Sequence, residues 1–293
     1  MSSDRLRTAC VQLNAGPAKA KNIEVAGALV AEAAAAGAEL VVLPEKWNGY
    51  GTPEVIEAAA ERIEDGESVR AMAAWARAHG IVIVGGSITE ARGGGAKPAN
   101  ASIVFDRQGE IAAVYRKIHM FDVDVGGVSY RESATEDAGE EAVICEVDGW
   151  RLGLSICYDL RFPELYRELA LAGAEIVVVP AAFTLATGKD HWELLLRARA
   201  TENQCFVVAP NQWGVDAGGR HLYGRSSIVD PWGVVRAQAA DADGVALADL
   251  DRRQMTRIRA EFPALSSRRP QAYRAPRLAA AGASTVPSRK DPE

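Results

Sequence analysis

Apolar runs recur along this chain, and most follow a segment whose apolar residues have helical spacing. Continuous runs rich in valine, isoleucine and leucine occupy residues 40–43, 81–84, 176–179 and 206–209. Such runs are typical of strands in a sheet that is covered on both faces. The spacing of apolar residues between them predicts helices over roughly 67–79 and 190–203. Strands that alternate with helices in this way indicate an α/β protein.

One segment occurs twice, because residues 36–44 read AGAELVVLP and residues 172–180 read AGAEIVVVP. In each copy the glycine is expected just past a helix end, where a left-handed backbone conformation suits it, and a buried strand follows. A Ser-Ile-Val strand followed by a turn glycine also recurs, at 102–109 and at 227–233. We therefore predict two similar halves with an internal pseudo-two-fold repeat, packed as a four-layer α/β/β/α sandwich.

Three polar residues stand at the ends of predicted strands. Cys157 ends an apolar run and precedes a helix expected to begin at Pro163, while Glu45 and Lys117 each end a run of their own. A cysteine attacks as the thiolate, which a helix start or a nearby ammonium group stabilises. Lys117 could also stabilise an oxyanion, and Glu45 could transfer protons. The three residues together predict covalent acyl chemistry.

Each of these three residues could instead have an ordinary structural role. A single cysteine at a strand end is more often a small buried apolar residue than a nucleophile. A glutamate or a lysine at such a position is usually a surface charge. The joint placement of all three at strand ends, in a repeat that brings the ends together, favours catalysis.

The chain resembles the nitrilase superfamily of carbon–nitrogen hydrolases over roughly residues 5–274. Leu43–Glu45 is similar to the family's glutamate motif, residues 115–121 (YRKIHMF) to its lysine motif, and residues 155–164 (SICYDLRFPE) to its cysteine motif. The resemblance implies the α/β/β/α fold and no metal or organic cofactor.

The resemblance also implies roles for individual residues. Glu45, Lys117 and Cys157 would form the catalytic triad, and Glu132 would be the second active-site glutamate that helps to position Lys117 or the substrate. The backbone N–H of Tyr158 would bind the oxyanion together with Lys117.

Within the superfamily the chain is most similar to the Nit branch of amidases, on the evidence of residues 121–123, 187–200 and 223–233. This implies hydrolysis of a small carboxamide to carboxylate and ammonia through a cysteine thioester, of the deaminated glutathione or ω-amidase type. One alternative is a nitrilase or an N-carbamoyl amino acid amidohydrolase, because the triad alone does not choose among these substrates. Another is a non-catalytic binding protein or a thiol sensor on the same fold. The intact triad counts against the former, and the lack of a nearby resolving cysteine against the latter.

Further residues are candidates for substrate contact. Arg161 could bind a substrate carboxylate in bidentate fashion, or it could form a structural ion pair with Asp159 or Glu164. Phe183 and Thr184, close to an expected helix start, are also substrate-binding candidates. The four histidines and four cysteines show no metal-ligand spacing, so we expect no metal site.

Composition and charge narrow the possible partners. The 293 residues are 48% hydrophobic and 25% charged, which suits a folded domain, and the net charge is −6. This acidic balance argues against nucleic acid and membrane surfaces, despite a basic run over 252–274. A small-molecule amide is the expected partner. Without a signal peptide or an apolar run of membrane-spanning length, the expected location is cytoplasmic.

The pattern also predicts how the chain is divided. Residues 5–250 would form the carbon–nitrogen hydrolase domain. Residues 251–277 would form a C-terminal helix and arm that packs on a neighbouring subunit, giving a homodimer or larger homo-oligomer. Residues 278–293, rich in alanine, serine, proline and charge, are expected to be a disordered tail.

Overall fold

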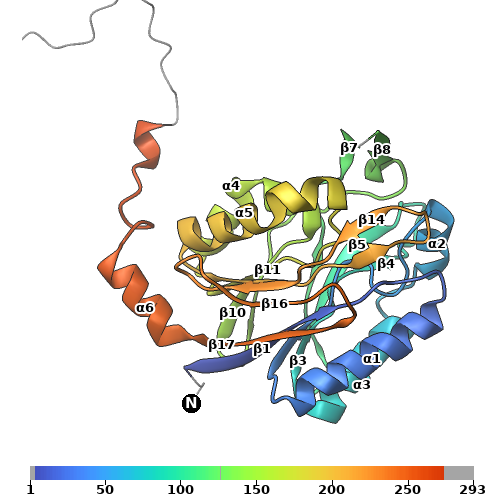
Figure 1. Cartoon of the computed structure of the whole chain (residues 1–293), viewed down its shortest axis with the longest axis horizontal. Coiled ribbons are helices and arrows are strands. Elements are labelled where there is room, and N and C mark those ends of the chain that lie inside the picture. The colour runs from blue at the N-terminus through green and yellow to red at the C-terminus, as the bar shows by residue number, and fades with distance from the viewer. Residues whose placement is uncertain (1–3, 126, 274–293) are drawn as a thin grey trace, which may run out of the picture.

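Two β-sheets stack face to face at the centre of the molecule, and helices cover their outer faces (Figure 1). The computed structural model describes residues 4–125 and 127–273. Helices α1 (Lys19–Ala35) and α3 (Glu67–His79) lie on one outer face, and α4 (Pro163–Leu171) and α5 (Leu185–Asn203) on the other. The predicted four-layer α/β/β/α sandwich is therefore confirmed.

The first sheet contains seven strands from the N-terminal half and from the end of the chain. Its order is β17-β1-β2-β3-β5-β4, and β6 pairs with β5. The bounds are β1 (Arg5–Gln12), β2 (Leu40–Val42), β3 (Val82–Val84), β4 (Ile88–Glu90), β5 (Ala99–Phe105), β6 (Ile111–Arg116) and β17 (Gly244–Asp251). Strands β1, β2 and β3 are parallel, and β5 runs antiparallel to β3. A short helix, α2 (Pro53–Ala59), lies near β4.

The second sheet repeats this arrangement with six strands in the order β16-β15-β12-β11-β10-β9. The bounds are β9 (Ile144–Val147), β10 (Trp150–Leu154), β11 (Ile176–Val178), β12 (Phe206–Ala209), β15 (Ser227–Val229) and β16 (Val235–Gln238). Strands β10, β11 and β12 are parallel, and β15 runs antiparallel to β12. The predicted internal repeat is thus present. Its two glycines, Gly37 and Gly173, both have positive φ, at 85° and 99°.

Burial on both faces of the sheets explains the continuous apolar runs. In β2, Leu40 and Val42 belong to the core that also contains the second sheet, whereas Val41 packs with residues of α1 and α3. In β3, Val82 and Val84 face the same way as Leu40. Because both faces of these strands are covered, no polar position interrupts the run.

Helix α5 begins earlier than its pattern predicts. The expected range was 190–203, but the helix runs from Leu185 to Asn203. Gly188 lies inside this helix and packs against the ring of Tyr223. A Cβ there would lie 2.4 Å from the Cβ of Tyr223, so the glycine serves a close approach within the helix.

Two hairpins and the last helices complete the described chain. The hairpins are β7 (Asp122–Val125) with β8 (Val128–Arg131), and β13 (Trp213–Val215) with β14 (His221–Tyr223). The last α-helix is α6 (Arg252–Glu261), and a short 3-10 helix follows at Pro270–Ala272. Helix α6 is attached to its own chain, because Arg259 donates to the carbonyl oxygens of Gln204 and Ala174. Residues 274–277 of the expected arm and the expected tail at 278–293 lie outside the described residues. No helix among residues 4–125 and 127–273 combines the length and the apolar character needed to cross a bilayer.

Candidate active site

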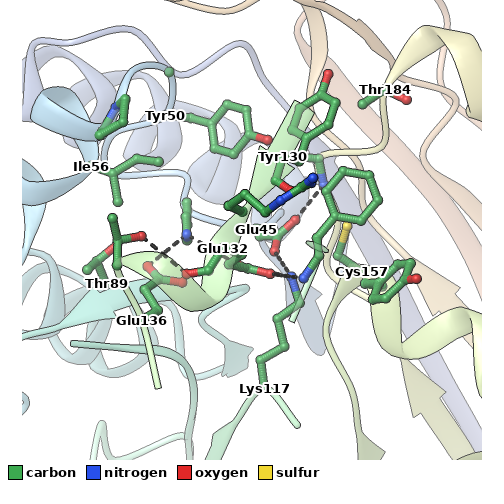
Figure 2. A pocket seen from close by; sticks show the side chains of 18 of the residues that line it. Glu45, Tyr50, Ile56, Thr89, Lys117, Tyr130, Glu132, Glu136, Cys157 and Thr184 are labelled. Carbon is green, nitrogen blue, oxygen red and sulfur yellow. Dashed lines mark hydrogen bonds and ion pairs between the residues drawn. The ribbon is translucent and has the colours of Figure 1, made fainter. Parts of the chain in front are cut away.

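A cavity of about 510 Å³ receives residues from both halves of the fold. Glu45 reaches it from just after β2, Lys117 from just after β6, and Cys157 from the turn after β10. All three predicted strand-end residues therefore line one cavity, and Figure 2 shows their side chains converging.

Cys157 sits on a strained turn at the start of a 3-10 helix over Cys157–Arg161. Its φ of 49° lies in the left-handed region, which a residue with a side chain rarely adopts. Its N–H donates to the carbonyl oxygen of Pro180 at 2.8 Å. This conformation places the thiol at the first position of the 3-10 helix, where it lines the cavity.

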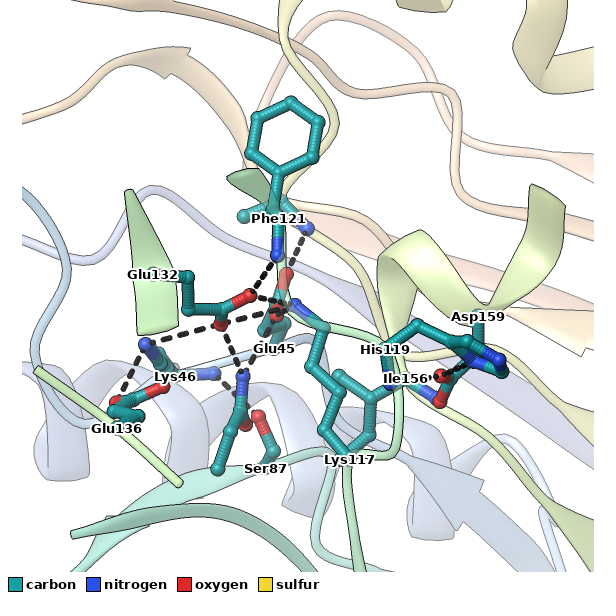
Figure 3. Close-up of polar contacts among 12 residues, drawn as sticks. Glu45, Lys46, Ser87, Lys117, His119, Phe121, Glu132, Glu136, Ile156 and Asp159 are labelled. Carbon is teal, nitrogen blue, oxygen red and sulfur yellow. Dashed lines mark hydrogen bonds and ion pairs between the residues drawn. The ribbon is translucent and has the colours of Figure 1, made fainter. Parts of the chain in front are cut away.

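The buried carboxylate of Asp159 holds this turn in place. It accepts hydrogen bonds from the N–H of Ile156 at 2.8 Å and from the hydroxyl of Tyr115 at 2.6 Å. The N–H of His119 also donates to it, at 3.1 Å, and its ring Nδ1 lies 2.7 Å away (Figure 3). The cysteine motif and the lysine motif are thereby bound to each other behind the cavity.

Glu45 is held by donors on both carboxylate oxygens. Oε1 accepts from Lys117 Nζ at 3.1 Å and from Asn100 Nδ2 at 2.9 Å, and Oε2 accepts from the N–H of Ala182 at 2.9 Å. Burial raises the pKa of Cys157 well above its usual value, Glu45 raises it further, and Lys117 lowers it. The resting thiol therefore keeps its proton, and Glu45 is the nearby carboxylate that can accept it.

Lys117 joins Glu45 to Glu132. Its Nζ lies 2.8 Å from Glu132 Oε2, which also accepts from the N–H of Phe121 at 2.7 Å. Burial alone would lower the pKa of Lys117, but Glu132 and Glu45 raise it well above its usual value. Lys117 is thus a permanent cation in the cavity, and Glu132 occupies the place expected of it after the lysine motif.

Sequence reasoning missed a second buried ion pair beside Glu132. Lys46 Nζ lies 3.6 Å from Glu132 Oε1 and 2.8 Å from Glu136 Oε1 (Figure 3). The side chains of Lys46 and Glu136 are only 5% and 1% exposed. Charges of opposite sign therefore alternate from Glu136 through Lys46, Glu132 and Lys117 to Glu45. The adjacency of Lys46 to Glu45 in sequence is the one signal that could have pointed to it.

Replacing Lys46 by methionine is expected to destabilise the fold by about 3–5 kcal/mol, because it leaves the Glu136 carboxylate buried without a cation. Beyond this ion pair with Lys46, neither Glu136 oxygen has a hydrogen-bond partner among the described residues. The matched variant Lys46→Met/Glu136→Met removes both charges and should recover most of the loss. Guanidinium denaturation measures both. A loss below about 1 kcal/mol for Lys46→Met alone would contradict a structural role for the pair.

Stability is expected to fall as the pH drops from about 4.5 to about 2. Burial alone would raise the pKa of Glu132, but Lys117 and Lys46 lower it from 4.5 to about 2. A depressed folded-state pKa stabilises the fold above the unfolded-state pKa, and that contribution disappears as the carboxylate is protonated. Calorimetry of the wild type and of Glu132→Gln should show a shallower acid dependence for the variant; parallel profiles would contradict this origin.

The predicted substrate-contact residues also line the cavity. Arg161 Cζ lies 5.4 Å from the ring centroid of Phe183 and 5.9 Å from that of Tyr158, and Thr184 is on the same wall. In the described structure Arg161 makes no ion pair with the acidic residues proposed as structural partners; its polar neighbour is His191 Nδ1, at 3.3 Å. The guanidinium group is therefore free to meet a substrate anion.

A metal ion would need a cluster of suitable ligands. In the described part of the chain, no group of three or more His, Cys, Asp or Glu side chains is arranged to hold one.

The chain is similar to a known protein family and to three known proteins. The family model described as carbon-nitrogen hydrolase matches residues 7–260. A deaminated glutathione amidase of Synechocystis sp. is 40% identical over 265 residues, covering 89% of this chain and 97% of the relative. An omega-amidase NIT2 of Danio rerio is 40% identical over 271 residues, covering 92% and 96%. The crystal structure of the C. elegans NitFhit protein superposes with a TM-score of 0.84 and 35% identity, over 93% of this chain and 67% of that one.

Proposed function

Because this chain belongs to the carbon–nitrogen hydrolase family of the nitrilase superfamily, we propose that it hydrolyses a small carboxamide to a carboxylate and ammonia through a thioester on Cys157. The observation that carries the proposal is the buried contact of Glu45 with Lys117 in the cavity that Cys157 enters. The amidase names of its relatives support this reaction class, with deaminated glutathione and ω-amido acids as the first substrates to test.

Acylation would begin when Glu45 accepts the proton of the Cys157 thiol. The thiolate then forms a bond to the amide carbonyl carbon, and the carbonyl oxygen becomes an oxyanion that faces Lys117 and the backbone N–H of Tyr158. As the C–N bond breaks, protonated Glu45 gives its proton to the departing nitrogen. Ammonia leaves from a primary amide, or the amine from a substituted amide, and the acyl group remains on the sulfur.

Deacylation would reuse the same groups. Glu45, again a carboxylate, accepts a proton from water, and the resulting hydroxide attacks the thioester carbon. The C–S bond breaks, the acid is released, and the thiolate recovers its proton from Glu45. Glu132 serves as a positioning residue, because it holds Lys117 within reach of both steps.

Arg161 would bind a carboxylate on the acyl half of the substrate, with Phe183 and Thr184 against the same part of the substrate.

The domain over 5–250 would carry the site, and α6 with the arm to residue 277 would pack on a neighbouring subunit in a homo-oligomer. The cytoplasm is the proposed location, because a reducing compartment suits four free cysteines.

A substrate panel tests the proposed reaction. It contains α-keto ω-amides, deaminated glutathione, N-carbamoyl amino acids and simple nitriles, with ammonia or amine release as the readout. Release from an amide that depends on Cys157 is the expected result. Turnover of nitriles or carbamoyl compounds alone would move the chain to the alternative chemistry, and no Cys157-dependent turnover would favour a binding protein or a thiol sensor.

A further inference from the structure

A second guanidinium group, that of Arg220, is held rigidly in the wall of the cavity. Its Nε donates to the buried carboxylate of Asp216 at 2.7 Å, and its Nη2 donates to the carbonyl oxygen of Gly51. Its Cζ lies 5.7 Å from the ring centroid of Tyr50 and 5.6 Å from that of Tyr130. The side chain is 28% exposed, and Nη1 makes no hydrogen bond to any described residue.

The surroundings of Tyr50 show which part of the site Arg220 faces. Burial raises the pKa of Tyr50 well above its usual value, Glu45 raises it further, and Arg220 opposes both. The phenol is therefore close to the catalytic carboxylate and to the guanidinium group at once. In Figure 2, Tyr50 and Tyr130 lie on the side of Glu45 away from Lys117. In the proposed mechanism Glu45 protonates the departing nitrogen, so this wall faces the amine half of the substrate.

The other two arginines of the cavity do not have this role. Arg131 is 51% exposed, and its Nη2 donates to both carboxylate oxygens of Asp124, while its Nη1 donates to backbone carbonyls of the same hairpin. Arg161 lies against Tyr158, the residue after the nucleophile, and so belongs to the acyl side of the site. The two guanidinium groups with free donors thus stand on different walls.

We propose that Arg220 determines specificity by binding a carboxylate carried by the amine half of the substrate. The preferred substrates are then amides of an amino acid or a short peptide, with a second carboxylate on the acyl half at Arg161. This inference rests on the proposed amidase function. Asp216 and the two tyrosines hold the guanidinium group in place before the substrate arrives, so little conformational entropy is lost on binding.

Three substrates with one common α-keto acyl group test the inference. They are the primary amide, the amide of glycine, and the amide of glycinamide, in which a neutral carboxamide replaces the terminal carboxylate of the glycine compound. We expect kcat/KM for the glycine amide to exceed that for the glycinamide amide by about 10- to 100-fold, since a charge-assisted hydrogen bond has this effect. In Arg220→Gln the ratio should fall toward one, whereas in Arg161→Gln it should persist while all three rates drop.

A second variant and a binding measurement keep the outcome decisive. Arg220→Gln leaves Asp216 buried without its cation, so Arg220→Gln/Asp216→Asn removes both charges and should show the same loss of discrimination. Calorimetry with Cys157→Ala compares the affinities for the glycine and glycinamide compounds without turnover. If binding of the glycine compound depends on Arg220 but no compound is hydrolysed, the amidase function is refuted and the role of Arg220 in binding stands. Equal affinity for both compounds, or an unchanged ratio in the Arg220 variants, would overturn the inference.

Discussion

Replacing Cys157 by alanine is expected to lower kcat for amide hydrolysis by about 10⁵-fold, the largest effect of any single change in this chain. The thiol of Cys157 lies where Glu45 and Lys117 meet, and alanine removes the sulfur while keeping the turn. Because the turn is held by Asp159, the variant should fold. Ammonia release by purified protein measures the loss.

Cys145→Ala is the matched control for this experiment. Cys145 is also buried, but it lies in β9 and does not line the cavity. Its replacement should leave hydrolysis within about twofold, because a small buried apolar side chain contributes packing alone. More than about a tenth of the wild-type rate in Cys157→Ala would rule out the thioester mechanism.

Glu45→Gln is expected to lower kcat by about 10³- to 10⁴-fold, because the amide cannot accept the thiol proton or activate water. Glutamine has the size of glutamate, but its NH₂ group is a hydrogen-bond donor. It must therefore face other donors, either Lys117 and Asn100 on one side or the N–H of Ala182 on the other. The loss should appear in kcat more than in KM, since Glu45 acts on the reacting atoms.

Two comparisons make the effect of Glu45→Gln specific. Glu54→Gln removes a fully exposed carboxylate from α2 and should not change the rate. The double variant Cys157→Ala/Glu45→Gln should be no slower than Cys157→Ala, because residues that act as one unit are not additive. Additive losses in the double variant would show that Glu45 acts independently of the thiol.

The strand ends could be predicted because their signal is local in sequence. The repeated segments at 36–44 and 172–180 each contain the helix end, the glycine and the buried strand, so the position of Glu45 after its strand followed directly. Helix α3 was predicted over its full range for the same reason, since its apolar spacing is continuous. The convergence of Glu45, Lys117 and Cys157 then followed from stacking two similar halves.

Other features depend on loops that the pattern does not encode. Lys46 and Glu136 meet only because the segment after β8 folds back over the end of β2. No sequence pattern in either segment predicts this contact. Arg220 is oriented by Asp216, which caps its own loop through the N–H of Gly218 at 2.8 Å. The sequence could not show whether Arg161 forms an ion pair with Asp159 or Glu164, because side-chain rotamers determine that contact.

Mass spectrometry of the enzyme, quenched during turnover of an amide, shows whether a thioester forms on Cys157. We expect a mass increase equal to the acyl group, located after digestion on the peptide that contains Cys157 and formed together with a burst of released amine. Turnover with an amine burst but no adduct on that peptide would contradict the thioester mechanism.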